Sequence, residues 1–175
     1  AIPIDDVVTA ARVAKGSFFN HFKDKQAFAN AIAREVRIEV EELVTAHNHG
    51  VDDPIERIAG GMKVAVDFAR AQPTRAIALM RSQGASTGQH NPLNRGLRQD
   101  IDAALERGQL RPEARSAGVL YWLGLCQALM ASMVEAQPGQ EDARTQLSAV
   151  LLLGLTGLGT PEAVARDIIA KLVAR

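Results

Sequence analysis

The fold is decided by residues 4–28, which read IDDVVTAARVAKGSFFNHFKDKQAF. A short helix with one apolar face is predicted at the start of this stretch, because apolar side chains recur there at i, i+3, i+4 and i+7: Ile4, Val7, Val8 and Ala11. After residues 12–14, a second short helix is predicted for residues 15–22, and Asp24 can cap a third. Two short helices with so brief a connection fit a helix-turn-helix, whose second helix can lie in the major groove of DNA.

The same stretch is both basic and aromatic. From Arg12 to Lys25 it carries four Lys or Arg residues against one acid, a local formal charge of +3, and it holds three of the chain's seven aromatic residues. Basic groups can neutralise phosphates, and phenylalanines can anchor a helix that is too short to be stable alone. The pattern is equally compatible with a packed, partly basic helical hairpin that has no nucleic-acid partner.

The whole chain has 20 Lys and Arg residues against 20 Asp and Glu residues, a formal net charge of zero. Taken alone, that balance disfavours a nucleic-acid binder. It is an average over two unlike parts, however, because an acidic remainder dilutes the basic stretch. The balance therefore predicts a modest non-specific affinity for DNA and does not exclude DNA as a partner.

The rest of the chain is predicted to be helical. Helical spacing of apolar residues recurs to the C-terminal end, whereas the alternation typical of strands is almost absent. Capping residues, prolines and glycines divide the pattern into helices at 24–47, 53–72, 74–83, 93–107, 112–136, 140–158 and from 160 onward, with a loop at 84–92. The expected fold is all-α, with a helix-turn-helix module and its connecting helix in residues 1–48 and a larger helical bundle in residues 49–175.

Composition restricts the compartment and the class of protein. The chain has a single cysteine, Cys126, which cannot form an internal disulfide and suits a reducing cytosol. The most apolar run, residues 149–158, is too short to cross a bilayer and is interrupted by glycine and threonine. No signal peptide is visible. A cytoplasmic protein without a membrane partner is expected.

An enzyme has little support in the sequence. Glu41, Glu42, His47 and His49 lie near a predicted helix end, but they form neither a nucleophile–base set nor a spacing typical of metal ligands. The pair of glycines at 60 and 61 lies inside a predicted helix, which favours close helix packing over phosphate binding. We therefore expect no enzymatic activity, no cofactor and no metal.

The order of residues in 4–25 resembles the DNA-binding signature of TetR-type transcriptional regulators. That family shows Lys-Gly-Thr-aromatic-Tyr-x-His-Phe in its recognition helix and a lysine opening the next helix; here residues 15–22 read KGSFFNHF, and Lys25 follows. The resemblance implies a homodimeric repressor that binds a palindromic DNA operator and is released by a small-molecule effector. The alternative is an all-helical ligand-binding or protein-interaction module that does not bind DNA.

The resemblance also implies which residues touch DNA. Carried over position by position, the candidates are Lys15, Gly16, Ser17, Phe19, Asn20, His21 and Lys25. Lys15, Gly16, Ser17 and Asn20 match the exposed face of the recognition helix, which reads bases or nearby backbone. Phe19 occupies the place of a tyrosine that usually contacts phosphate, and His21 and Lys25 match positions that contact the phosphate backbone. Phe18 and Phe22 are better interpreted as core residues.

The sequence departs from the family pattern at several positions. Arg12 stands where the family often has glycine, so a positive φ there would cost roughly 1 kcal/mol. Ala14 replaces the serine that usually caps the recognition helix, a loss of about 1 kcal/mol. Phe19 lacks the tyrosine hydroxyl, so one phosphate contact is expected to be absent. The family's first helix has no counterpart in residues 1–3, and the helix-turn-helix module is therefore expected to be truncated.

The predicted helices at 112–136 and 140–158 are apolar over much of their circumference. Such helices must be buried on more than one side, and the simplest second partner is another copy of the chain in an isologous dimer. The expected interface residues are Leu147, Val150, Leu151 and Leu155. The alternative is that the central helix is fully buried within one monomer.

A cavity for the effector is expected in the bundle. The candidate lining residues combine adaptable sulfur side chains with the only Trp and Tyr of the chain: Met62, Val66, Met80, Tyr121, Trp122, Cys126 and Met130. The lining is expected to be apolar with few charges, and so the effector is expected to be largely apolar. At helical spacing, however, such residues more often belong to an ordinary helical core.

Overall fold

The computed structural model describes residues 4–81 and 92–174, and most of these residues are in helices, with no strand among them. The elements in chain order are α1 (Ile4–Ala10), α2 (Lys15–His21), α3 (Lys25–His47), α4 (Pro54–Ala71), α5 (Pro73–Arg81), the 3-10 turn η2 (Pro92–Asn94), α6 (Arg95–Glu106), α7 (Ala114–Ala136), α8 (Gln140–Leu158) and α9 (Glu162–Val173). The predicted all-α fold is confirmed. The loop predicted at 84–92 lies almost wholly outside the described residues.

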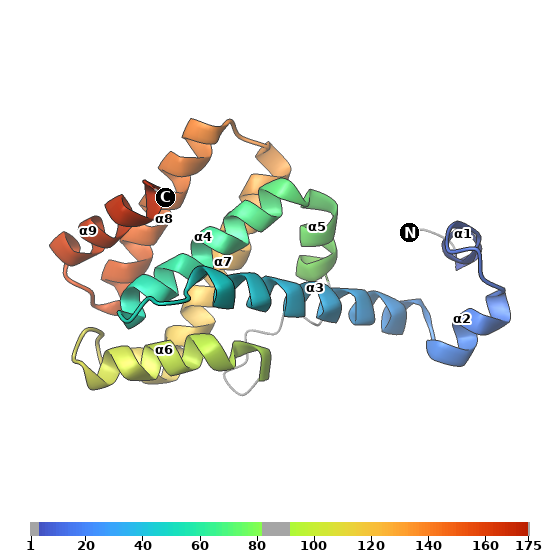
Figure 1. Ribbon diagram of the computed structural model, residues 1–175, viewed down its shortest axis with the longest axis horizontal. Coiled ribbons are helices and arrows are strands. Elements are labelled where there is room, and N and C mark those ends of the chain that lie inside the picture. Colours follow the sequence, from blue (N-terminus) through green and yellow to red (C-terminus); the bar gives the residue numbers. More distant parts are fainter. Residues whose placement is uncertain (1–3, 82–91, 175) are drawn as a thin grey trace.

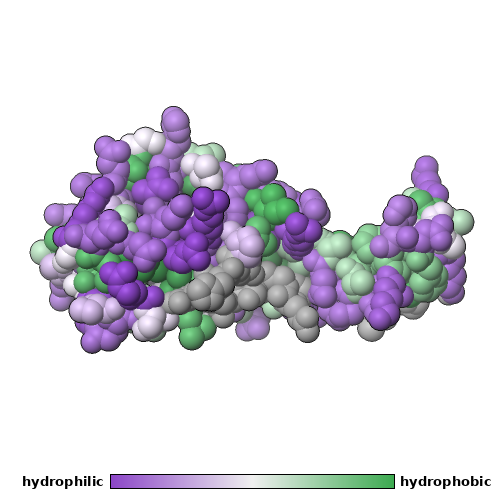
Figure 2. All heavy atoms as spheres, turned by 90° about the horizontal axis from the view of Figure 1, so that it is seen from below, coloured by the Kyte–Doolittle hydropathy of each residue, from purple (hydrophilic) through white to green (hydrophobic). Residues whose placement is uncertain are grey.

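The molecule consists of a small head and a larger bundle joined by one long helix. Helices α1 and α2 form the head at the N-terminal end of α3, and helices α4 to α9 gather around its other end (Figure 1). The head stands clear of the bundle (Figure 2). Because α3 belongs to both parts, any movement of α3 in the bundle must also move the head. The predicted division after residue 48 stays a prediction.

Backbone hydrogen bonds hold the connection between α1 and α2. The Arg12 N–H donates to Thr9 O at 3.1 Å, and the Val13 N–H donates to Val8 O at 3.0 Å. Arg12 adopts a left-handed φ of 55°, so the strain predicted at this position is present. Ala14 is the N-cap of α2 and forms no side-chain capping hydrogen bond, which confirms the loss expected from the missing serine.

Aromatic rings attach α2 to the start of α3. Phe18 is buried, and its ring centroid lies 5.3 Å from that of Phe28, while the Phe22 and Phe28 centroids are 5.0 Å apart. Asp24 caps α3, since its carboxylate accepts a hydrogen bond from the Ala27 N–H at 2.7 Å. The prediction of Phe18 as a core residue is confirmed, and Phe22 is half-buried beside it.

The C-terminal half of α3 is built into the bundle. Val36 and Val40 are buried where α3 packs against α4 and α5, and Glu39 forms an ion pair with Arg75 of α5. The N-terminal part of α3 instead runs out toward the head (Figure 1). One helix therefore carries the head at one end and packs firmly into the bundle at the other.

Helix α7 is the central element of the bundle. It packs against α4, α5, α6 and α8 and buries Trp122, Leu129 and Met133. By length and composition alone α7 would also be apolar enough to cross a membrane. Here its apolar circumference is divided between the bundle interior and an outer face, where Leu120 and Tyr121 are exposed.

The two neighbouring glycines of α4 have different surroundings. A Cβ at Gly60 would lie 2.5 Å from Asn48 Oδ1 and 2.9 Å from His47 Cδ2, so the end of α3 approaches α4 this closely only because the position is glycine. A Cβ at Gly61 would meet only Val44 Cγ1, at an ordinary 3.7 Å. The prediction that this pair permits close helix packing is confirmed for Gly60, whereas Gly61 faces a cavity.

Candidate functional site

A cavity of about 310 Å³ lies in the bundle where α3, α4, α5, α6 and α7 converge. Its lining includes apolar residues from all five helices: Val40, Val44, Ile58, Ala65, Leu79, Met80, Leu97, Trp122, Leu123 and Met130. It also includes charged and polar residues: Arg37, Glu41, Thr45, Asn48, Arg57, Asp100 and Gln127. The cavity therefore combines an apolar wall with several hydrogen-bonding groups, a combination typical of small-molecule sites.

One ion pair lies on the part of α3 that faces the cavity. The Arg37 guanidinium lies 2.7 Å from Glu41 Oε1, one helical turn away. The same Arg37 nitrogen donates to Leu93 O at 3.2 Å and to Asn94 Oδ1 at 3.0 Å, and Asn94 is buried. Burial raises the pKa of Glu41, although the charge of Arg37 opposes the shift. Arg37 thus joins the cavity wall and α3 to the start of α6.

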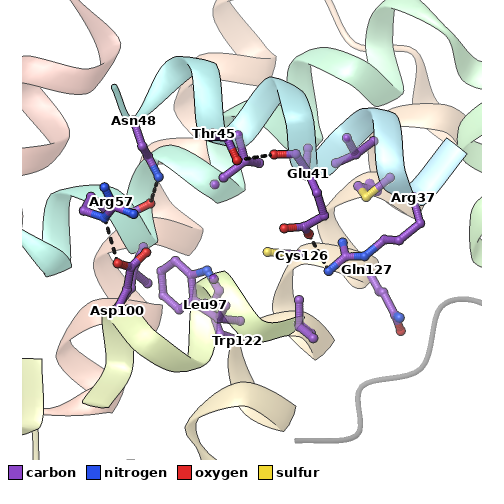
Figure 3. Close-up of a pocket in the computed structure, with 18 of the residues that line it drawn as sticks. Arg37, Glu41, Thr45, Asn48, Arg57, Leu97, Asp100, Trp122, Cys126 and Gln127 are labelled. Carbon is purple, nitrogen blue, oxygen red and sulfur yellow. Dashed lines mark hydrogen bonds and ion pairs between the residues drawn. The ribbon is translucent and has the colours of Figure 1, made fainter. Parts of the chain in front are cut away.

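A second ion pair joins α4 to α6. Arg57 Nε lies 2.7 Å from Asp100 Oδ1, and Asn48 donates from Nδ2 to the Arg57 backbone oxygen at 3.0 Å. Burial raises the pKa of Asp100, and the hydrogen bond from Arg57 counteracts part of that shift. In Figure 3 the Arg57–Asp100 pair and the Arg37–Glu41 pair lie on opposite sides of the cavity.

Trp122 and Cys126 lie between the two ion pairs. The Trp122 indole is only 1% exposed and appears between Asp100 on one side and Glu41 on the other (Figure 3). Burial raises the pKa of the Cys126 thiol to about 12, so this group is a neutral thiol near pH 7 and contributes an apolar surface rather than a nucleophile. Among the described residues, no cluster of His, Cys, Asp and Glu could hold a metal ion.

The structure brings together some of the predicted effector-site residues and separates others. Met80, Trp122, Cys126 and Met130 line the cavity. Met62 is fully buried in the core, and Val66 lies in a separate groove beside Lys63 and Arg70. Tyr121 points away from the cavity, and its hydroxyl donates to Leu153 O at 3.4 Å on the outside of the bundle. The seven residues are therefore not one site.

The expectation of few charges in the lining is wrong, because two arginines and two carboxylates belong to the cavity wall, although much of the wall is apolar as predicted. Arg37, Glu41, Arg57 and Asp100 are not among the effector-site residues predicted from the sequence. Arg37 and Glu41 are spaced i, i+4, which is typical of an ordinary surface ion pair on a helix. Arg57 and Asp100 are 43 residues apart and have no local signal that joins them.

The predicted DNA-contacting residues all lie on the head or at its junction with α3. Lys15, Gly16, Ser17, Phe19, Asn20 and His21 are exposed along α2, and Lys25 is half-buried at the start of α3. Phe19 is 48% exposed although it is aromatic, which leaves its ring available to a partner. Their role toward DNA stays a prediction.

The outer face of α7 and α8 is apolar. Leu120, Tyr121 and Leu153 are 58%, 37% and 69% exposed, and they lie beside exposed small residues of both helices: Ala117, Gly124, Ala128, Ala149 and Gly157. A Cβ at Gly157 would lie 2.2 Å from the Tyr121 hydroxyl oxygen, so the Tyr121 side chain of α7 lies directly on α8. The exposed residues of the two helices therefore form one continuous surface. We call this surface the α7–α8 face.

The predicted dimer residues do not lie on the α7–α8 face. Leu147, Leu151 and Leu155 are 4%, 0% and 0% exposed, because they pack into the interior of the same chain, and Val150 is half-buried. The outward row of α8 instead contains Ala149, Leu153 and Gly157. The predicted residues therefore lie on the inward side of a helix that is apolar nearly all round.

Comparison with known proteins adds evidence about the fold. No protein-family model and no curated protein matches the chain. The chain is similar to the crystal structure of RolR in complex with the ligand resorcinol, with a TM-score of 0.66 and 21% identity, and the match covers 97% of this chain and 83% of that chain. The chain shares the fold of RolR. RolR without ligand matches with a TM-score of 0.62 and 22% identity over 97% of this chain and 86% of that chain.

The likeness to RolR includes both parts of the molecule. Because 97% of the chain is covered, the head, α3 and the bundle all belong to the shared fold. At 21% and 22% identity the likeness shows the fold alone.

Proposed function

We propose that the protein is a ligand-responsive, DNA-binding transcriptional regulator of the TetR type. The observation that carries the proposal is that α3 bears the head at one end and forms a wall of the cavity at the other. RolR, which shares the fold, has been crystallised with and without a small molecule, resorcinol. The TetR-like residues lie on the exposed side of α2, where a duplex could reach them.

The head is suited to DNA by its charge and its shape. Arg12, Lys15 and Lys23 are exposed on the head, and Lys25 opens α3 beside them. Helix α2 carries the small residues Gly16 and Ser17 on its exposed surface, so its backbone can approach a base edge or a phosphate closely. The basic residues would bind the phosphates, and α2 would enter the major groove.

The cavity can be coupled to the head through Arg37. Lys25 and Arg37 are 12 residues apart on α3, roughly 18 Å along a helix. Arg37 holds α3 to Leu93 and Asn94 and also pairs with Glu41 on the cavity wall. A ligand that attracts Glu41 would loosen or rotate this attachment, and a small rotation at Arg37 becomes a larger displacement at the head. An effector that prefers the displaced state would then release DNA by a shift of population.

The first test of the proposal is DNA binding by the head. In an electrophoretic mobility assay on duplexes from upstream of its own gene, the protein is expected to retard a palindromic site. Lys25→Ala should lower the affinity for every sequence and reduce the slope of log K against log salt by about 1. Lys171→Ala is the matched control, because Lys171 is exposed on α9 at the far end of the chain.

The outcomes separate two functions. Absence of retardation at low salt would contradict the regulator. If the protein nevertheless binds a small molecule, the result favours the alternative of a ligand-binding module without a DNA role.

The regulator is also proposed to be a homodimer through the α7–α8 face. This face is continuous, apolar and rich in small residues, so a self-complementary contact through it would join two copies of the chain. A dimer of this kind carries two heads, and binding to a palindrome requires them to reach half-sites about 34–36 Å apart. Leu153 is the most exposed large apolar side chain on the face. An unpaired carboxylate at its centre would oppose association, because burying it costs several kcal/mol.

Light scattering on a sizing column tests the dimer. The protein should have twice its monomer mass of 18.8 kDa, and Leu153→Glu should shift it to the monomer at micromolar concentration. Leu43→Glu is the control, because Leu43 is 43% exposed on α3 and does not belong to the α7–α8 face. A monomeric parent protein, or a dimer that Leu153→Glu leaves intact, would contradict this interface.

A further inference from the structure

The charges around the cavity restrict the charge of its ligand. Arg37, Glu41, Arg57 and Asp100 form two ion pairs, so their formal charges cancel. An anion or a cation in this cavity would add a net charge to a partly buried site that has already paired its own charges. The cavity is therefore matched to an uncharged molecule.

The same four residues restrict the polar groups of the ligand. The described hydrogen bonds use Oε1 of Glu41 and Oδ1 of Asp100, and none of them uses Glu41 Oε2 or Asp100 Oδ2. Arg37 is already bonded to Glu41, Leu93 and Asn94, while the Arg57 side chain is 37% exposed and can be hydrated. Acceptor oxygens are thus available on both sides of the cavity, and a ligand can satisfy them by donating hydrogen bonds.

The middle of the cavity is suited to a flat apolar body. In Figure 3 the Trp122 ring lies between the two ion pairs, and Leu97 and Cys126 lie close to it. An aromatic ring can stack against or meet the edge of the indole, while the leucine and the neutral thiol provide apolar contact. A volume of about 310 Å³ is at the lower end of the range for ligand pockets, which favours a molecule of one or two small rings.

We propose that the cavity binds an uncharged aromatic molecule with two hydroxyl groups on different carbons of its ring, one donating to Glu41 and the other to Asp100. A dihydroxybenzene is the simplest member of this class. The inference deepens the proposed function, since it names the class of effector, but ligand binding itself does not depend on the ability to bind DNA. Because a hydroxyl on each side is required, the two carboxylates act together rather than as alternative sites.

Three probes of similar size separate the parts of this proposal. Resorcinol carries two hydroxyls, 1,3-dimethoxybenzene has the same ring without donors, and 3-hydroxybenzoate replaces one hydroxyl by a negative charge. Their binding to the full chain can be measured by titration calorimetry and by the fluorescence of Trp122, the single Trp of the chain, which lines the cavity. Resorcinol is expected to bind, with both other probes at least about 10-fold weaker, because a hydrogen bond to a charged group contributes about 1.5–3 kcal/mol.

Two variants test the two carboxylates. Glu41→Gln and Asp100→Asn should each weaken resorcinol at least about 10-fold, whereas their effect on 1,3-dimethoxybenzene should be small because that probe has no hydroxyl to donate. Glu162→Gln is the matched control, because Glu162 pairs with Arg166 on the exposed side of α9 and does not line the cavity. Thermal melting of each variant shows whether the fold is kept, and the probe comparison on the unaltered protein needs no variant at all.

The proposal is overturned if 3-hydroxybenzoate binds more tightly than resorcinol, if 1,3-dimethoxybenzene binds equally well, or if resorcinol does not bind. These outcomes are distinct from a failure of the proposed function. If resorcinol binds but DNA is not retarded, the proposed regulator is contradicted and the proposed ligand class is supported. If DNA is retarded but 3-hydroxybenzoate binds more tightly than resorcinol, the regulator is supported and the ligand class is contradicted.

Discussion

Gly159→Ala is expected to lower the free energy of unfolding by about 3 kcal/mol or more, whereas Gly108→Ala should cost only about 1 kcal/mol. Both glycines follow the C-terminal end of a helix with a positive φ, 107° after α8 and 66° after α6. A residue with a Cβ is disfavoured in this region by roughly 1–2 kcal/mol, so both variants lose stability. The difference between them comes from the space around each position.

At Gly159 a Cβ would lie 2.7 Å from the backbone nitrogen of Arg111 and 3.1 Å from its Cβ. The nearest atom belongs to the backbone, and the Arg111 N–H also donates to Leu158 O at 2.8 Å, so a shift would disturb that hydrogen bond. At Gly108 nothing lies within 4 Å of the added Cβ. Position 159 therefore combines an unfavourable φ with a backbone clash, and position 108 has only the first of these.

Urea denaturation measures both effects as a lower urea concentration at the unfolding midpoint, while the dependence of the free energy of unfolding on urea concentration stays unchanged. A loss at Gly108 equal to that at Gly159 would show that backbone conformation alone decides the cost. That result would contradict the close approach of Arg111 to the end of α8.

The parts of the fold that the sequence predicts are those with local signals. The left-handed φ at Arg12, the uncapped start of α2 at Ala14 and the Asp24 cap of α3 all follow from residues within a few positions of each other. Asp53 caps α4 in the same way, by accepting from the Ile55 N–H at 2.7 Å. Each of these depends on backbone geometry over one turn, which the order of residues nearly determines.

The polar side of the cavity has no such signal. Asp100 and Arg57 meet only because α6 packs on α4, and that packing depends on apolar residues elsewhere on the two helices. Arg37 and Glu41 are neighbours on α3 in any environment, so their spacing does not tell a solvated pair from one on a cavity wall. The four charged residues that give the cavity its polar groups therefore cannot be recognised as site residues from a single sequence.

The outward side of α8 is hidden for a different reason. Helix α8 has apolar residues on nearly every side, so the spacing of these residues does not indicate which side of the helix faces the core. Leu151 and Leu153 differ by two positions, yet the first is fully buried and the second is 69% exposed. The packing of α4, α7 and α9 against α8 decides which of them faces outward.

Gly61→Leu is expected to weaken resorcinol binding by roughly 10- to 100-fold while it keeps or raises stability. Gly61 lies on the cavity wall in the interior of α4, and an added Cβ would meet only Val44 Cγ1 at 3.7 Å, so the leucine side chain can extend into the cavity. Replacing a glycine inside a helix by leucine favours the helix by about 0.8–1 kcal/mol. Ligand and leucine would then compete for the same space, and forcing both into it costs about 1–3 kcal/mol.

The matched control is Gly61→Ala, which gains at least as much helix stability but fills little of the cavity. It should bind resorcinol nearly as well as the parent protein, with binding followed by quenching of Trp122 fluorescence and stability followed by urea midpoints. If the proposed function holds, DNA retarded by Gly61→Leu should no longer be released by resorcinol, because the variant keeps the head and α3 and loses only the ligand. Unchanged resorcinol affinity in Gly61→Leu would mean that the ligand binds elsewhere, and equal loss in Gly61→Ala would mean that the α4 backbone, rather than the volume of the cavity, determines binding.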